Sequence, residues 1–356
     1  MTVCALGYVF MSGCEGESSD SLKGEGEASD NSADCDGDLR CIDNSCGSIG
    51  DGDADADGDA DSDGDADSDG DADSDGDNDD ECNNAAEKGY RTIAQDTVTR
   101  EYILHVPASY DSNTPTPLVI NFHGFGDCAA DYSMVIGGFY NLDSLADISN
   151  FLVAYPQGVV REKEAAEWDP GDNGSQNINE NDVYFAEQLI SDISNEYNVD
   201  LSRVYATGYS NGGMMAYGLA CSRGNLIAAA GIMSGIMLQG TCDVNEYTSI
   251  IHFHGIADDA LPYEGNQDFQ SVSDVIDLWL NHNNIPASSL VTTELNGGDV
   301  VRDEYTGGNE NTSVVLYTIN SEHDKPGGHV WFSDDIGGTN PNQILWDFLS
   351  NYSLDD

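Results

Sequence analysis

Basic residues are scarce in this sequence, which has 11 lysines and arginines against 66 aspartates and glutamates, a formal net charge of −55 over 356 residues. Nucleic-acid binding needs a basic face for the phosphates, so this balance argues against DNA or RNA as a partner. It also disfavours docking on anionic lipid. The body of the chain has no apolar run of about 18 residues, so we expect no transmembrane helix there.

The charge is distributed unevenly, which suggests where the chain divides. Residues 1–82 hold 27 acidic and two basic residues, and residues 83–356 hold 39 acidic and nine basic residues. Between positions 51 and 77 every second residue is Asp, so this stretch has little apolar surface to bury and strong self-repulsion. We therefore expect a leader over 1–20, a disordered acidic linker over 21–82, and a folded domain over 83–356.

The acidic linker contains four hexapeptides of the form D-A-D-[A/S]-D-G, the first of which starts at Asp53. This pattern opens an EF-hand loop, in which alternate carboxylates converge on calcium. An EF-hand loop needs a bidentate Glu at its twelfth position. The first three repeats have Gly64, Gly70 and Gly76 there, so a complete EF-hand is not expected. Two interpretations stay open: a purely solvated spacer, or weak calcium binding by Asp53, Asp55, Asp57, Asp59, Asp61 and Asp63.

The first residues are similar to the end of a bacterial lipoprotein signal. An apolar stretch over 3–11 is followed by Ser12, Gly13 and Cys14, so a small residue precedes a cysteine that could carry lipid. No Lys or Arg precedes the apolar stretch, although export signals usually have a positive start. We expect a secreted or cell-surface protein, with a lipid anchor at Cys14, a cleaved signal or a meaningless leader as the alternatives.

The nine cysteines fit an exported protein. Cys35, Cys41 and Cys46 lie in a small polar segment that lacks the histidine and the C-x2-C pairs usual in zinc sites. Disulfides explain them more simply. In the larger region Cys221 with Cys242, and Cys82 with Cys128, are candidate pairs, although a sequence alone does not fix the connectivity.

After residue 82 the sequence alternates between short apolar runs and segments of helical spacing. This alternation predicts a doubly wound, mostly parallel α/β sheet, whose sites form where strands end. We expect strands near 102–106, 117–123, 151–155, 204–207, 228–233, 249–253 and 314–319. We expect helices near 182–197, 211–221, 272–282 and 343–352.

A serine nucleophile is predicted at Ser210, in the pattern Gly208-x-Ser210-x-Gly212. The pattern alone is weak, but an apolar run precedes it and a helix-like segment follows. This is the strand, sharp turn and helix that a nucleophile elbow requires. The glycines allow a strained turn in which the serine hydroxyl stands clear of the sheet. The alternative is a glycine-rich helix start that only packs tightly.

A serine needs a histidine base oriented by a carboxylate, and in elbow-type hydrolases these follow in the order Ser, Asp or Glu, His. Asp258 follows an apolar run ending near 255 and is the predicted acid, with Asp259 as its competitor. His254 is expected to be structural, beside the end of the same strand. No cofactor is needed for this chemistry.

His329 is the predicted base, because the glycines before it let a loop carry its ring over the active site. His282 lies in a helical pattern and is expected at the surface. His323 lies in a charged loop and is expected to be solvated. The oxyanion hole needs two backbone N–H donors. We assign these to Asn211, just after the nucleophile, and to Phe125, with Gly124 as the alternative.

These residues carry a specific resemblance over roughly 95–350. The sequence resembles the bacterial esterases grouped with polyhydroxybutyrate depolymerases and with feruloyl and acetylxylan esterases of carbohydrate esterase family 1. The matching segments are His123-Gly124, the helix start at 181–185, the run 199–214, the segment 254–263 and Gly327-Gly328-His329-x-Trp331. The resemblance implies an α/β-hydrolase domain over 83–356 with Ser210, Asp258 and His329 as its triad. Phe332 and Leu261 depart from the family pattern, which leaves the substrate open.

The expected function is a secreted serine ester hydrolase that acts through an acyl-enzyme on feruloyl or acetyl esters of plant polysaccharide. Trp168 and Trp331 are the expected substrate contacts, through stacking on an aryl group or a sugar ring. A polyhydroxyalkanoate depolymerase is the alternative within this class. An alternative of another class is a surface-tethered binding module whose Asp repeats hold calcium.

Overall fold

The computed structural model describes residues 39–42, 45–48, 89–95, 98–134, 140–160, 165–171, 182–242, 245–320 and 328–355. The chain divides into two units, Met1–Asp75 and Gly76–Asp356. In the first, β1 (Leu39–Ile42) pairs antiparallel with β2 (Ser45–Ser48). Several predicted features lie outside the described residues and stay predictions: the lipidation candidate Cys14, the calcium candidates over 53–63, Cys82 and the borders of the expected domains.

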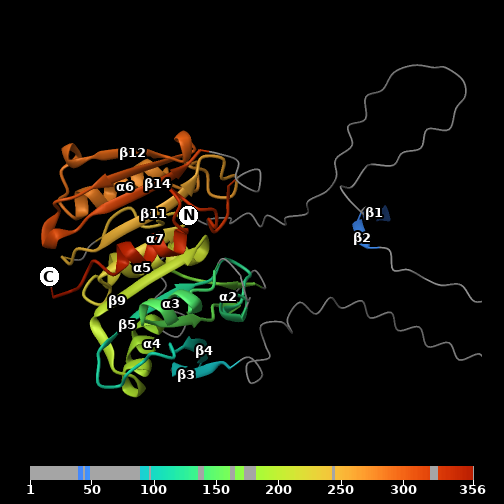
Figure 1. Cartoon of the computed structure of the whole chain (residues 1–356), viewed down its shortest axis with the longest axis vertical. Coiled ribbons are helices and arrows are strands. Elements are labelled where there is room, and N and C mark those ends of the chain that lie inside the picture. The colour runs from blue at the N-terminus through green and yellow to red at the C-terminus, as the bar shows by residue number, and fades with distance from the viewer. Residues whose placement is uncertain are drawn as a thin grey trace, which may run out of the picture. The chain divides into compact units, whose positions relative to one another are not determined.

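A ten-stranded sheet runs through the second unit, with β12 and β3 at its two edges (Figure 1). Six central strands are parallel to one another, and two antiparallel strands extend the sheet on each side. In spatial order the strands are β12 (Val291–Leu295), β13 (Val300–Tyr305), β14 (Val314–Ile319), β11 (Ser249–Gly255), β10 (Ala229–Met233), β9 (Val199–Tyr209), β5 (Thr116–Phe122), β6 (Leu152–Pro156), β4 (Val98–His105) and β3 (Arg91–Gln95).

Helices cover both faces of this sheet, because its strands are apolar on both sides. One face packs against α4 (Asp182–Glu196), α5 (Asn211–Ser222) and α6 (Val272–His282). The other packs against α2 (Ala129–Met134), α3 (Asp143–Ser149) and α7 (Pro341–Leu349). A short pair, β7 (Val159–Val160) and β8 (Ala166–Glu167), lies outside the main sheet, as do the 3₁₀ turns η1 (Ala287–Ser289), η2 (Asn296–Gly298) and η3 (Asn309–Asn311).

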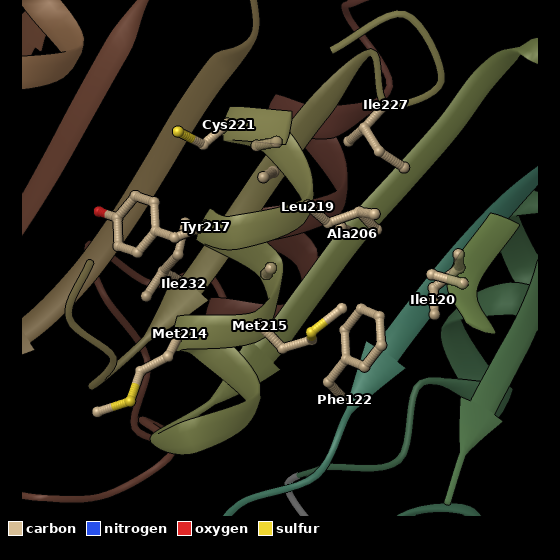
Figure 2. Close-up of a cluster of buried hydrophobic side chains, with 14 of the residues drawn as sticks. Ile120, Phe122, Ala206, Met214, Met215, Tyr217, Leu219, Cys221, Ile227 and Ile232 are labelled. Atoms are coloured by element: carbon tan, nitrogen blue, oxygen red, sulfur yellow. The ribbon is translucent and has the colours of Figure 1, made fainter. Parts of the chain in front are cut away.

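The two cores follow from the alternation of side chains along each strand. In β5, Leu118 and Ile120 belong to the first core, whereas Val119 between them belongs to the second. Figure 2 shows side chains of α5 over those of β5, β9 and β10 in the first core. Every residue of α5 from Gly212 to Cys221 is buried, so this helix lies at the centre of the domain and not on its surface.

The predicted fold class is confirmed: a mostly parallel, doubly wound sheet with helices on both faces. Each of the seven expected strands and four expected helices coincides with an observed element. The antiparallel edge strands β3, β12 and β13 and the helices α2 and α3 were not expected. In the described part of the chain no helix has the length and apolarity to cross a bilayer.

The predicted disulfide between Cys221 and Cys242 is present and ties the end of α5 to the segment after β10. Cys128 is also disulfide-bonded. Its expected pairing with Cys82 stays a prediction. In the β1–β2 hairpin Cys41 lies directly opposite Cys46.

An ion pair is buried inside the domain between Arg100 of β4 and Asp182 of α4. The Arg100 Nη2 and Asp182 Oδ1 atoms are 2.7 Å apart, and both side chains are almost completely shielded from solvent. The guanidinium lies 3.9 Å from the centre of the Phe185 ring and donates to the Gln157 carbonyl. Asp182 also accepts the backbone N–H of Asp169, so the pair fixes the segment that carries Trp168 against α4.

Replacing one partner of this pair should destabilise the fold, because the other charge then stays buried without its counterion. We expect Arg100→Met to lower the free energy of unfolding by about 3–5 kcal/mol in urea titrations. The matched control is Arg203→Met, which breaks a partly exposed pair with Asp200 and should cost at most about 1 kcal/mol. Equal losses in the two variants would show that burial does not set the effect.

Candidate active site

Ser210 lies at the sharp turn between β9 and α5. Its backbone has φ 53° and ψ −118°, a conformation that costs a non-glycine residue about 1–3 kcal/mol. The flanking glycines allow this turn. A Cβ on Gly208 would lie 2.8 Å from the Phe122 carbonyl oxygen, and one on Gly212 would lie 2.5 Å from the His123 carbonyl oxygen. The turn therefore has the geometry that the G-x-S-x-G pattern predicts.

The three predicted triad residues form one hydrogen-bonded line. His329 Nε2 lies 2.9 Å from Ser210 Oγ, and His329 Nδ1 lies 2.8 Å from Asp258 Oδ2. Asp258 follows β11 and His329 follows β14, so all three stand at the carboxyl ends of parallel strands. The competitor Asp259 is exposed, and it is the Asp258 carboxylate that His329 contacts.

Asp258 is buried and surrounded by hydrogen-bond donors. Its Oδ1 accepts the backbone N–H groups of Ala260 at 3.0 Å and Leu261 at 2.8 Å. Its Oδ2 faces His329 and also His254, whose Nε2 is 3.3 Å away. Burial opposes ionisation, but the hydrogen bonds from His254 and His329 outweigh it and lower the pKa of Asp258 to about 2. The carboxylate is therefore charged at neutral pH.

The loop that carries His329 is held by hydroxyl groups at the carboxyl ends of two neighbouring strands, β9 and β10. The Tyr209 hydroxyl donates to the His329 carbonyl at 2.7 Å, and the Ser234 hydroxyl donates to the Val330 carbonyl at 2.8 Å. Gly328 adopts a φ of 70° just before the histidine. Sequence reasoning missed Tyr209 and Ser234, although Tyr209 lies inside the G-x-S-x-G pattern, because a pattern does not reveal where a hydroxyl points.

The loop after β5 is the predicted source of an oxyanion donor. The Gly124 N–H donates to the Tyr132 hydroxyl at 2.9 Å, and this hydroxyl lies 3.2 Å from Asp127 Oδ2. Gly124 is thus engaged, and the assignment of Phe125 to the donor pair stays a prediction. The second predicted donor, the N–H of Asn211, is the first of α5, and the first N–H groups of a helix have no acceptor within it.

His123 fixes the start of this loop from inside the protein. Gly158 N–H donates to its Nε2 at 2.9 Å, so Nδ1 carries the proton and donates to the Gly124 carbonyl at 2.7 Å. Burial lowers the pKa of His123 to about 4. His123 is therefore a neutral scaffold at neutral pH.

The two tryptophans expected to bind substrate are both buried, each with 3% of its surface exposed. The Trp168 indole N–H donates to the His123 carbonyl, and the amide side chain of Asn211 bonds to the backbone of Trp168. The Trp331 indole N–H donates to Asn342. Both side chains support the elbow and the histidine loop. A stacking role for them stays a prediction that this burial does not favour.

The remaining histidines lie apart from the nucleophile. His254 is fully buried beside the end of β11, where a structural residue was expected. His282, at the end of α6, bonds to the Glu246 carbonyl, and His323 lies outside the described residues. Within the described ranges, no three His, Cys, Asp or Glu side chains gather as metal ligands would.

Comparison with known proteins agrees with this geometry. Residues 100–254 match the family model described as Esterase PHB depolymerase, a span that includes Ser210. The probable feruloyl esterase C of Aspergillus terreus is 27% identical over 256 residues, covering 70% of this chain and 84% of that protein. Feruloyl esterase C of Emericella nidulans is 26% identical over 254 residues, covering 70% of this chain and 83% of that protein.

A similarity to a solved structure concerns the fold. The acetyl xylan esterase from Aspergillus awamori superposes with a TM-score of 0.52 at 15% identity, covering 73% of this chain and 98% of that one. The ordered sheet, the elbow and the matched family domain point to the same class of protein. The chain is a carboxylic ester hydrolase of the α/β-hydrolase fold, and its residues 100–254 match the family model described as Esterase PHB depolymerase.

Proposed function

We propose that the protein cleaves feruloyl or acetyl esters of plant polysaccharide through an acyl-enzyme formed on Ser210. The observation that carries the mechanism is the hydrogen-bonded line from Ser210 through His329 to Asp258. Because each heavy-atom separation in this line is below 3 Å, the hydroxyl proton has a direct route to the imidazole. The mechanism uses only groups of the chain itself.

In the first half of the reaction Ser210 Oγ attacks the ester carbonyl carbon while His329 Nε2 takes its proton. The carbonyl oxygen becomes an oxyanion facing the backbone N–H groups of Asn211 and Phe125, near the N-terminus of α5. Asp258 stays ionised and stabilises the imidazolium. The tetrahedral intermediate then collapses, and His329 gives the proton to the departing alcohol of the sugar.

In the second half a water molecule takes the place of the alcohol. His329 accepts a proton from this water as it attacks the acyl carbon, and a second oxyanion forms at the same donors. Collapse of this intermediate breaks the bond to Ser210 Oγ, which regains its proton from His329. The free carboxylic acid leaves, and the resting line of hydrogen bonds is restored.

The substrate class rests on the names of the relatives and on charge. The similar proteins of Aspergillus terreus and Emericella nidulans are named feruloyl esterases. The region 83–356 carries 39 acidic and nine basic residues, so it repels an anionic polymer such as pectin at low salt. A nearly neutral feruloylated or acetylated xylan meets no such repulsion. Polyhydroxyalkanoate is the second candidate, favoured by the description of the matched family.

Export of the protein is part of this proposal, because a polysaccharide substrate lies outside the cell. The disulfide between Cys221 and Cys242, and the disulfide-bonded state of Cys128, are typical of oxidising compartments. A lipid anchor at Cys14 would hold the enzyme at the cell surface. Calcium on the Asp repeats would affect the linker and not the reaction.

Removing the nucleophile should abolish turnover. We expect Ser210→Ala to lower kcat on p-nitrophenyl acetate by a factor on the order of 10⁶, because the variant has no oxygen on which to form the acyl-enzyme. The measurement is the steady-state rate of p-nitrophenol release, with circular dichroism as the control for folding. A folded variant with a rate near that of the wild type would refute the mechanism.

The two neighbouring aspartates provide a matched pair. Asp258→Asn should lower kcat by about 10⁴, because an amide can no longer stabilise the imidazolium and favours the wrong tautomer of His329. Asp259→Asn removes the same charge from the next residue, which is exposed. This variant should keep kcat within a factor of about two. If Asp259→Asn were the damaging change, the assignment of the acid would be wrong.

A hydrolysis panel distinguishes the two substrate candidates. It compares methyl ferulate, acetylated xylan, short p-nitrophenyl esters and a polyhydroxybutyrate film, each with wild-type enzyme and with Ser210→Ala as the blank. We expect methyl ferulate or acetylated xylan to be hydrolysed far faster than the film, measured as released ferulate, acetate or hydroxybutyrate. Faster release from the film would instead identify a depolymerase.

A further inference from the structure

A line of buried polar side chains continues behind the acid of the triad. The Tyr217 hydroxyl of α5 lies 2.8 Å from His252 Nδ1, and His252 Nε2 lies 3.0 Å from His254 Nδ1. His254 Nε2 lies 2.8 Å from the Leu261 carbonyl oxygen and 3.3 Å from Asp258 Oδ2. Tyr217, His252 and His254 all have 0% of their surface exposed. The line therefore joins the central helix to the catalytic carboxylate without access to water.

The acceptor at the end of the line fixes the direction of every hydrogen bond in it. A carbonyl oxygen only accepts, so His254 Nε2 carries a proton that faces both Leu261 and Asp258. In the uncharged form of His254, Nδ1 is bare and accepts from His252 Nε2–H. His252 in turn has a bare Nδ1, which accepts from the Tyr217 hydroxyl. All donors point from Tyr217 toward Asp258, so the line polarises in one direction.

Two members of the line, Tyr217 and His252, stay neutral at neutral pH. Burial and the neighbouring His254 hold the pKa of His252 well below its ordinary value. The groups packed beside the line are aromatic: Tyr263 next to His254, and Trp279 next to Tyr217. Burial raises the pKa of Tyr217 well above its ordinary value, so its hydroxyl keeps its proton. Tyr217 and His252 thus act through fixed dipoles and not by a change of charge.

We infer that Tyr217, His252 and His254 are positioning residues that orient the Asp258 carboxylate toward His329. The inference rests on the proposed catalytic role of the triad. His254 Nε2–H approaches the same oxygen, Oδ2, that His329 Nδ1 contacts, so rotation of the carboxylate away from His329 breaks both bonds. Tyr217 and His252 ensure that the proton of His254 lies on the side that faces Asp258.

Substitutions of His254 test the end of the line. His254→Leu removes the donor, whereas His254→Gln retains an N–H group at the position of Nε2. We expect His254→Leu to lower kcat on methyl ferulate by about tenfold or more with KM little changed, because a hydrogen bond to a charged group is lost. His254→Gln should recover most of kcat. The loss stays well below the roughly 10⁴-fold loss that disabling the triad carboxylate causes in serine proteases.

The pH profile of kcat/KM separates positioning from general damage. Asp258 shares its charge between two histidines in the wild type. Without the donor at His254 that charge acts on His329 alone and stabilises the imidazolium, so the acidic limb moves to higher pH in His254→Leu. The downfield proton resonance of the His329–Asp258 hydrogen bond should shift as well. A loss of packing alone would lower the amount of active enzyme but would leave the pH profile and the proton resonance unchanged.

Tyr217→Phe tests the far end of the line and keeps the volume of the side chain. It should lower kcat by a factor of about two to five and move the same proton resonance. The matched control is Tyr205→Phe. Tyr205 is an equally buried tyrosine whose hydroxyl donates to the Tyr352 carbonyl on the other face of the sheet, so this variant should leave kcat and the resonance unchanged.

All rates are expressed per active site titrated with a serine-reactive phosphonate, so that unfolded protein is not counted. Wild-type kcat and pH profile in His254→Leu would overturn the inference, and if that variant does not fold, the same result in Tyr217→Phe would do so. If Ser210→Ala is inactive, either of these two results overturns only the positioning role and not the proposed function. Activity in Ser210→Ala would instead refute the proposed function.

Discussion

The site depends on how closely the turn at Ser210 packs against the loop after β5. No side chain fits between Gly208 or Gly212 and the backbone of Phe122 and His123, so the chain passes there as bare backbone. This contact brings the N–H of Asn211 and the loop of Phe125 to the same end of the sheet. The Asn211 side chain then bonds to the backbone of Trp168, which fixes a third segment to the turn. One strained residue thus sets the positions of the nucleophile and both expected oxyanion donors.

Sequence reasoning found what local patterns encode. Ser210 sits between two glycines whose spacing reflects the sharp turn, and Asp258 and His329 follow apolar runs that are buried strands. The central strands were predictable because they are buried on both faces and appear as continuous apolar runs. The edge strand β12 was not, because its residues Val291 to Glu294 are exposed and mostly polar, and only pairing with β13 makes them a strand.

The side chains that support the site were hidden for a related reason. Trp168 and Trp331 suggested substrate contacts because they are large aromatic residues near the triad motifs. Their burial depends on segments distant in the sequence, since Trp168 donates to His123 and Trp331 packs edge-on against Tyr140. The hydroxyls of Tyr209 and Ser234, which hold the histidine loop, have partners about 100 residues away. No periodicity within one segment indicates such a contact.

The described part of the chain buries two carboxylates, Asp182 and Asp258, and stabilises them in two different ways. Asp182 takes the cation, Arg100, at a place where the ion pair joins β4 to α4. Asp258 instead faces four N–H donors: two backbone N–H groups, His254 and His329. A permanent cation at Asp258 would neutralise the charge that the imidazolium needs during the reaction, whereas fixed dipoles keep the carboxylate ionised and leave that charge available to His329.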